Sequence, residues 1–241
     1  MKRNQSGFTL IEIAIVLVII GLLLGGVLKG QELINSAKVK NLAGDFRNVP
    51  LFIYGYQDKF KTLPGDDRAV DTHLSGLKPN CPGGTCPIPV ANITAGNGVI
   101  NGLWNSITST DESYLFWQHV RLAGFAPGTT AVPGTPAHGD GYLPINAVGG
   151  EVGIMSGTST AANSPVKDTA GNAIRGSYII CSSAILGKFA KQLDTQMDDG
   201  NTAAGSMMAV PTGSALNTTA TPTTGVGGID DAASYTVCMG I

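Results

Sequence analysis

Charged side chains are scarce in this chain, and the shortage limits what the protein can be. Asp, Glu, Lys and Arg make up 13% of the 241 residues, about half the share of an ordinary soluble domain. The formal net charge is −2, so no strong overall field attracts nucleic acid, which we do not expect as a partner. The apolar share of 43% excludes a disordered composition. The length suffices for one or two domains with a real core.

The common catalytic and nucleotide-binding patterns are also missing. The sequence has no G-x-S-x-G, H-E-x-x-H or Walker motif. The GNGVING stretch at 96–102 has the wrong glycine spacing for a dinucleotide site. The three histidines, His73, His119 and His138, are scattered, and we expect His119 and the nearby Trp117 to be packing residues. We therefore expect no enzymatic activity; a membrane-anchored periplasmic enzyme is a remote alternative.

The one long apolar run begins close to the N-terminus. Residues 8–28 contain only two polar side chains, Thr9 and Glu12, and as a helix they span about 32 Å, the thickness of a bilayer core. Lys2 and Arg3 precede the run, so we expect the N-terminus to stay in the cytoplasm and the rest to be exported. An ordinary signal peptide is disfavoured, because no clear A-x-A site follows and the helical pattern continues.

Beyond residue 28 the apolar residues form a stripe at helical spacing. Its members are Val39, Leu42, Phe46, Val49, Ile53, Tyr56 and Phe60. The charged residues fall off the stripe, at Lys40, Asp45, Arg47, Asp58, Lys59 and Lys61. We predict one helix from residue 8 to about residue 61, apolar all round in its first part and on one side in its second.

Glycines and one proline should weaken this helix locally. Gly21, Gly25 and Gly26 each cost about 1 kcal/mol relative to Ala in a helix. Pro50 removes a backbone hydrogen bond and should kink the helix. The spacing of Gly21 and Gly25, repeated at Gly26 and Gly30, favours close packing against other helices. An ordinary single anchor with incidental glycines is the alternative.

Four cysteines are present, and an even count in an exported chain favours disulfides. Cys81 and Cys86 enclose the tight-turn sequence PGGT, which leaves Cys181 to pair with Cys238. Free buried thiols and a zinc site are the alternatives. Zinc is disfavoured because the C-x-x-x-x-C spacing is loose and no histidine lies close in sequence.

Several shorter elements are predicted in the remainder. Pro64 and Gly65 suit a turn, after which Asp66 or Asp67 is expected to cap a short helix. Residues 106–124 read as a helix that begins with a capping box, Ser109 with Glu112, and ends at Gly124. Residues 176–200 read as a strand followed by a helix, and residues 233–239 as a closing strand.

The stretch SGFTLIE within KRNQSGFTLIEIAIVLVIIGLLL resembles the N-terminus of type IV prepilins and of the pseudopilins of type II secretion. The resemblance implies that a prepilin peptidase in the inner membrane cuts between Gly7 and Phe8 and methylates the new amine of Phe8. It also implies that Glu12 serves assembly, its carboxylate pairing with the Phe8 amine of a neighbouring subunit. The pairing is physically reasonable, because an uncompensated acid in the apolar phase costs roughly 2.5–3.5 kcal/mol.

The expected fold class is α+β and pilin-like: a long N-terminal helix packed on a small antiparallel sheet with long irregular loops. We expect a leader at 1–7, a transmembrane and filament-core helix at 8–28, an amphipathic helix at 29–61 and a periplasmic or extracellular head at 62–241. Before assembly the chain is expected as a single-pass protein of the bacterial inner membrane, in contact with an assembly platform.

The leading functional interpretation is a structural subunit of a type IV pilus-like filament that polymerises with copies of itself or with other pilins. A minor pilin at the filament tip, adhesive or DNA-binding, is one alternative. The other is a pseudopilin of a type II secretion system. The product is accordingly a cell-surface pilus or a periplasmic pseudopilus.

Three acidic residues near the end of the helix predicted within residues 176–200, Asp194, Asp198 and Asp199, raise the question of a metal. Some pseudopilins bind calcium through acidic loops, so the resemblance makes these residues a weak calcium candidate. The spacing of a calcium-binding loop is not met, and a solvated turn in which Asp bonds its own backbone is the preferred interpretation. We therefore expect no cofactor.

Overall fold

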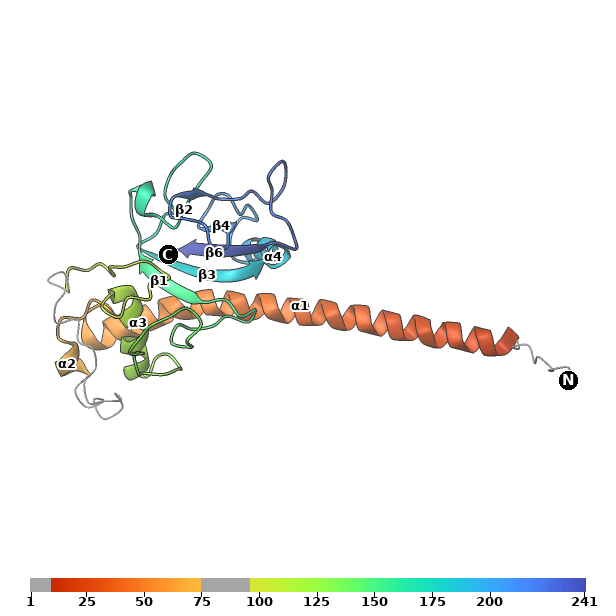
Figure 1. Ribbon diagram of the computed structural model, residues 1–241, viewed down its shortest axis with the longest axis horizontal. Coiled ribbons are helices and arrows are strands. Elements are labelled where there is room, and N and C mark those ends of the chain that lie inside the picture. The colour runs from red at the N-terminus through yellow and green to blue at the C-terminus, as the bar shows by residue number, and fades with distance from the viewer. Residues whose placement is uncertain (1–9, 75–95) are drawn as a thin grey trace. The chain divides into compact units, whose positions relative to one another are not determined.

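The computed structural model describes residues 10–74 and 96–241 (Figure 1). The elements follow the chain in the order α1 (Leu10–Phe60), α2 (Val70–His73), α3 (Glu112–Leu122), β1 (Val152–Ser156), the 3-10 turn η2 (Ala161–Asn163), β2 (Val166–Lys167), β3 (Tyr178–Leu186), α4 (Gly187–Met197), β4 (Met207–Pro211), β5 (Thr218–Thr219) and β6 (Ser234–Gly240). The chain divides into two compact units, Met1–Lys38 and Val39–Ile241.

The described part of the first unit is helical throughout. It belongs to α1, which runs without a break to Phe60 and so confirms the prediction of one long helix. Its most apolar window has a mean hydropathy of 2.8, and none of that window is buried in the protein. Large apolar side chains from Leu10 to Leu28 are exposed, between 46% at Ile20 and 93% at Leu10. This segment is therefore long and apolar enough to cross a membrane.

In the second unit, α1 buries one side. The buried residues are Val39, Leu42, Ala43, Phe46, Val49, Ile53 and Tyr56, which confirms the predicted stripe. Phe60 is half-buried and packs against a small cluster of Val70, Leu74 and Leu122. Pro50 lies inside α1, and the helix continues for ten residues beyond it.

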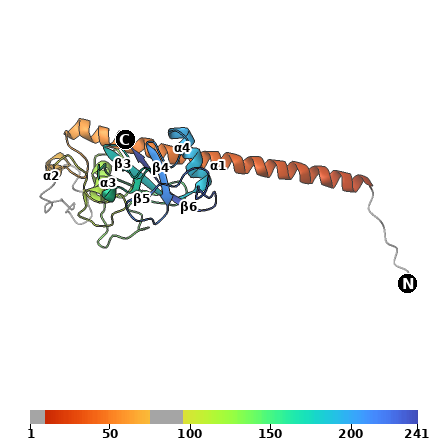
Figure 2. The same cartoon turned by 90° about the horizontal axis from the view of Figure 1, so that it is seen from above.

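The main sheet has four antiparallel strands in the order β1-β3-β6-β4. One face shares a core cluster with α1, to which Ile154, Ile180 and Val237 contribute. Figure 2 shows this part of α1 running along the sheet. The other face carries a second cluster with Met155, Ile179 and Val210, which is covered in part by Trp104. Alternate residues therefore serve two different cores, as the two-residue period of a strand requires.

The turn after α1 is tied to the core by two aspartates. Asp67 is fully buried and accepts hydrogen bonds from the Tyr56 hydroxyl (2.7 Å) and the Ala69 amide (2.9 Å). Asp66 accepts from the backbone amides of Gly96, Asn97 and Gly98. The predicted capping role is wrong, because α2 has Ala69 at its N-cap and no side-chain cap bond. The two acids instead fix the loop geometry around the end of α1.

Gly65 in the same turn has no possible substitute with a side chain. Its φ is +89°, a conformation that L side chains rarely adopt. A β-carbon at this position would also overlap the carbonyl oxygen of Glu112. The Pro64–Gly65 turn thus brings the chain directly against the start of α3.

Helix α3 lies within the predicted range 106–124 but begins only at Glu112; it ends before Gly124, whose φ is +84°. The predicted capping box is wrong. The N-cap is Asp111, which makes no side-chain cap bond. Glu112 instead accepts hydrogen bonds from the backbone and side-chain nitrogens of Asn101, both at 2.8 Å. The Glu112 carboxylate thus bonds the loop that contains Asn101. The spacing of residues along the helix does not predict this contact.

Candidate functional site

The first turn of α1 contains the acid on which the assembly prediction rests. Glu12 is the acidic residue of that turn, and its side chain is exposed in the single subunit. The processing residues Gly7 and Phe8, and the leader charges Lys2 and Arg3, lie outside the described residues. The roles assigned to these residues and to Glu12 stay predictions.

The glycines in the apolar part of α1 make no packing contact with the described part of the chain. A β-carbon built at Gly21, Gly25 or Gly26 would meet no other atom within 4 Å. These positions are therefore not kept small by any described part of the subunit itself. Small residues at such spacing allow a neighbouring helix to approach closely, so the described surface is open to packing between subunits.

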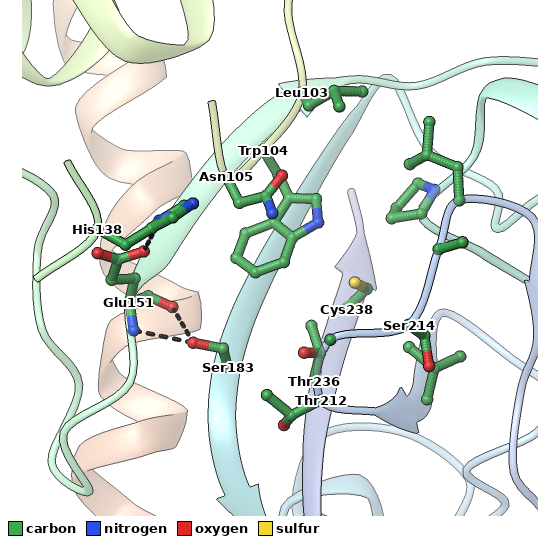
Figure 3. A pocket seen from close by; sticks show the side chains of 15 residues that line it. Leu103, Trp104, Asn105, His138, Glu151, Ser183, Thr212, Ser214, Thr236 and Cys238 are labelled. Atoms are coloured by element: carbon green, nitrogen blue, oxygen red, sulfur yellow. Dashed lines mark hydrogen bonds and ion pairs between the residues drawn. The ribbon is translucent and has the colours of Figure 1, made fainter. Parts of the chain in front are cut away.

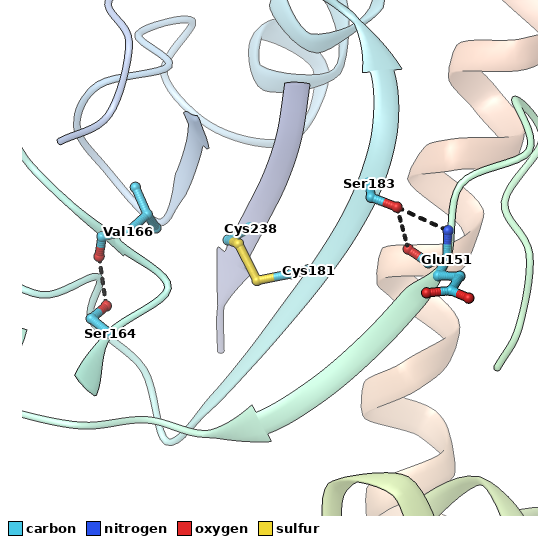
Figure 4. Close-up of a disulfide and its surroundings, with 6 residues drawn as sticks. All are labelled: Glu151, Ser164, Val166, Cys181, Ser183 and Cys238. Carbon is cyan, nitrogen blue, oxygen red and sulfur yellow. Dashed lines mark hydrogen bonds between the residues drawn. A yellow bond between two sulfur atoms is a disulfide. The ribbon is translucent and has the colours of Figure 1, made fainter. Parts of the chain in front are cut away.

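A disulfide crosses the centre of the main sheet. Cys181 on β3 and Cys238 on β6 are opposite each other in the register, with a Cα–Cα distance of 4.0 Å (Figure 4). Both are fully buried. The predicted pairing is confirmed, and free thiols or zinc at these two residues are wrong. Cys81 and Cys86 lie outside the described residues, so their pairing stays a prediction.

The acidic residues after α4 do come together. The carboxylates of Asp194, Asp198 and Asp199 offer oxygens that all lie within 4.8 Å of one another. Two of them already bond the backbone: Asp198 accepts from the amides of Ser206 (2.7 Å) and Met207 (2.9 Å), and Asp199 accepts from the amide of Asn201 (2.8 Å). These bonds match the preferred interpretation of a turn held by its own aspartates.

Asp194 differs from its two neighbours. It is fully buried, and neither carboxylate oxygen makes a hydrogen bond of normal geometry with another described residue. Burial raises its pKa to about 7, and the Gly200 amide only partly offsets this. Three carboxylates at this separation fit a divalent cation as part of its oxygen shell. Calcium stays a weak, untested candidate beside the preferred interpretation of a solvated turn, and the sequence did not reveal the deep burial of Asp194.

A pocket of about 440 Å³ opens beside the face of the sheet that carries the disulfide (Figure 3). It lies between the loop with Trp104 and Asn105, the His138–Glu151 pair, and the segment from Thr212 to Leu216. Thr236 and Cys238 of β6 contribute to its wall. No sequence pattern points to the polar residues here, because they come from separate segments of the chain; only His138 was named above, as one of three scattered histidines.

The arrangement defines a class: an α+β protein of pilin-like fold whose N-terminal helix carries a membrane-competent apolar segment. Residues 2–28 match the family model described as the prokaryotic N-terminal methylation motif, which is the signature of the type IV prepilin and pseudopilin family. A search of the curated proteins found no match, and neither did a search of the solved structures. The motif implies processing by prepilin peptidase and assembly with other pilins.

Proposed function

We propose that this chain is a structural, non-enzymatic subunit of a type IV pilus-like filament. The single observation that carries the proposal is the described start of α1. It combines an exposed apolar surface, an acid in the first turn and glycines with open space around them. Such a surface is stable in a bilayer or in the apolar interior of a helical assembly.

In this proposal each segment of the chain has its own role. Residues 1–7 are the leader, 8–28 the membrane and filament-core helix, 29–61 the amphipathic helix and 62–241 the head. Cleavage after Gly7 creates an amine on Phe8, four positions before Glu12. The amine of one subunit pairs with the Glu12 carboxylate of another, which offsets the cost of both charges in an apolar environment. The chain then leaves the inner membrane for a filament on the cell surface.

The test is Glu12→Ala in cells that assemble the filament. We expect the variant to be exported and cleaved but to be almost absent from the filaments sheared off the cells, because the amine lacks its partner. Glu32→Ala is the matched control on the same helix. Glu32 is exposed and pairs with Lys29, at 2.6 Å, and such a surface pair contributes little.

Normal amounts of Glu12→Ala in the sheared fraction would show that the charge pairing is not needed. The same fractionation separates the related candidates. A major subunit is abundant in the sheared fraction, a minor tip subunit is present in traces, and a pseudopilin is retained by the cells.

A further inference from the structure

The pocket of Figure 3 has the features of a binding site that filament assembly does not use. It belongs entirely to the second unit, and its volume of about 440 Å³ lies within the usual range for small-molecule sites. Its wall combines one indole with amide and hydroxyl groups, while Val210 and Cys238 supply apolar surface.

Gly153 on β1 leaves room for Trp104 to pack closely against the strand, beside the second core cluster. A β-carbon at Gly153 on β1 would overlap the carbonyl oxygen of Trp104 and come within 3.2 Å of its ring. Trp104 therefore lies directly on the strand. Its side chain is only half-buried, and Figure 3 shows the ring between the His138–Glu151 pair on one side and Thr236 on the other. A fixed, partly exposed aromatic ring is a preorganised stacking surface.

Three polar groups around this ring have no partner in the part of the chain that the structure describes. They are the Trp104 Nε1–H, the Asn105 side-chain amide and the Thr236 hydroxyl, none of which makes a hydrogen bond with another described residue. Together they offer donors and acceptors at one place. Thr236 is 6% exposed, so its hydroxyl is one that a ligand could satisfy at little cost in lost hydration.

The one carboxylate that lines the described pocket already has two hydrogen-bonding partners. Glu151 contacts His138 Nδ1 through one oxygen and accepts from the Gly139 amide through the other, both at 2.7 Å. No lysine or arginine lines the described pocket. A site for an anion would need such a cation or a set of converging amides, so the pocket is suited to a neutral ligand.

The geometry points to a neutral hexopyranose, alone or at the end of a glycan, as the ligand of this pocket. One face of such a ring presents C–H groups, which pack on the negative face of an indole. Its edge presents hydroxyls that both donate and accept, which matches the Asn105 amide and the Thr236 hydroxyl. The sugar stacks on Trp104 and satisfies the groups that the protein leaves open.

The experiment uses the full-length protein in a zwitterionic detergent, because glucoside and maltoside detergents carry competing sugars. Methyl glycosides of glucose, galactose and N-acetylglucosamine are titrated and followed by saturation-transfer NMR. We expect saturable binding of at least one glycoside with a Kd on the order of 1 mM, a value usual for few contacts. Asn105→Ala and Thr236→Val should each weaken binding about tenfold, and Trp104→Ala should abolish it.

Ser159→Ala is the matched control, because it removes an exposed hydroxyl from a different surface hollow and should leave Kd unchanged. Thr236→Val has nearly the same shape as wild type and removes a hydroxyl with no described partner, so it should not unfold the protein. Absence of saturable binding of every glycoside to the wild type overturns the proposal. So does unchanged Kd in the Asn105 and Thr236 variants, or tighter binding of sialic acid, an anionic sugar.

Discussion

His119 is a buried histidine that the fold keeps neutral. It is 1% exposed, and its Nδ1 accepts a hydrogen bond from the Gly65 amide at 2.9 Å. Nε2 therefore carries the proton, and it has no hydrogen-bond partner among the described residues. Burial lowers the pKa of His119 to about 4, an effect that the nearby Asp67 only partly offsets. The ring serves as a structural acceptor at the Pro64–Gly65 turn.

This histidine should make stability depend on pH. Above the unfolded value of about 6.5 it is neutral in both states, so its contribution to stability is fully present. Below that value the unfolded chain takes up a proton that the folded chain refuses until about pH 4. We expect the free energy of unfolding to fall as the pH drops through this window, by up to about 3 kcal/mol from this group.

The measurement is chemical unfolding of wild type and of His119→Asn between pH 7 and pH 4. The amide oxygen of Asn retains an acceptor near the Gly65 amide but does not titrate. We expect the variant to lose the His119 part of the slope, while the part due to carboxyl groups remains. Identical slopes for the two proteins would mean that His119 is protonated at no cost in the folded state.

At the scale of elements, one side of α1 packs in the core and the other side is exposed. Leu42 is fully buried in the core shared with the sheet, whereas Leu51, nine residues later, is 64% exposed. Leu42→Ala should lower the free energy of unfolding by about 2–5 kcal/mol, because it removes buried contacts and leaves a cavity. Leu51→Ala changes the same side chain at the surface and should stay within about 0.5 kcal/mol.

Thermal unfolding of the two variants compares them directly. An equal loss of stability in the two variants would show that the apolar stripe from Val39 to Tyr56 does not determine how α1 packs. Because Leu51 is open in the single subunit, Leu51→Ala is also the variant in which to look for a defect in assembly without a defect in folding.

Helix α1 could be predicted from the sequence because its apolar residues recur at a regular local spacing. The disulfide could be predicted because the number of cysteines is small. The stripe from Val39 to Tyr56 has a fixed period, and four cysteines leave few pairings. The candidate sites were harder to predict. Glu112 bonds Asn101 rather than its own helix, and Trp104 meets Gly153 across 49 positions. Such contacts depend on how loops fold back on the sheet, which no period in the sequence encodes.

At the scale of the whole molecule, the chain consists of two units whose surfaces suit different environments, one apolar and one aqueous. The first unit exposes an apolar helix surface, while the second has its own core, to which residues from Val39 to Met239 contribute. A polypeptide of residues 39–241 should therefore fold by itself and remain soluble without detergent. Its thermal unfolding midpoint should lie within a few degrees of the full-length value, since the removed residues add nothing to that core.

Circular dichroism and size-exclusion chromatography of that polypeptide check the expectation. Cooperative unfolding from a monodisperse species is the expected result. Aggregation, or loss of a cooperative transition, would show that the first unit is needed for folding and that the division at Lys38 has no thermodynamic meaning.

The position of the Cys181–Cys238 bond has a mechanical consequence. Strand β6 is hydrogen-bonded on both sides, by β3 and by β4. A force pulling on the residues that follow Cys238 would ordinarily peel such a strand away one hydrogen bond at a time. The covalent link to β3 stops that peeling at Cys238, so only Met239 to Ile241 can detach before the load passes to β3. Under tension the sheet therefore yields as a unit, a property that the filament subunit proposed above would use to transmit force.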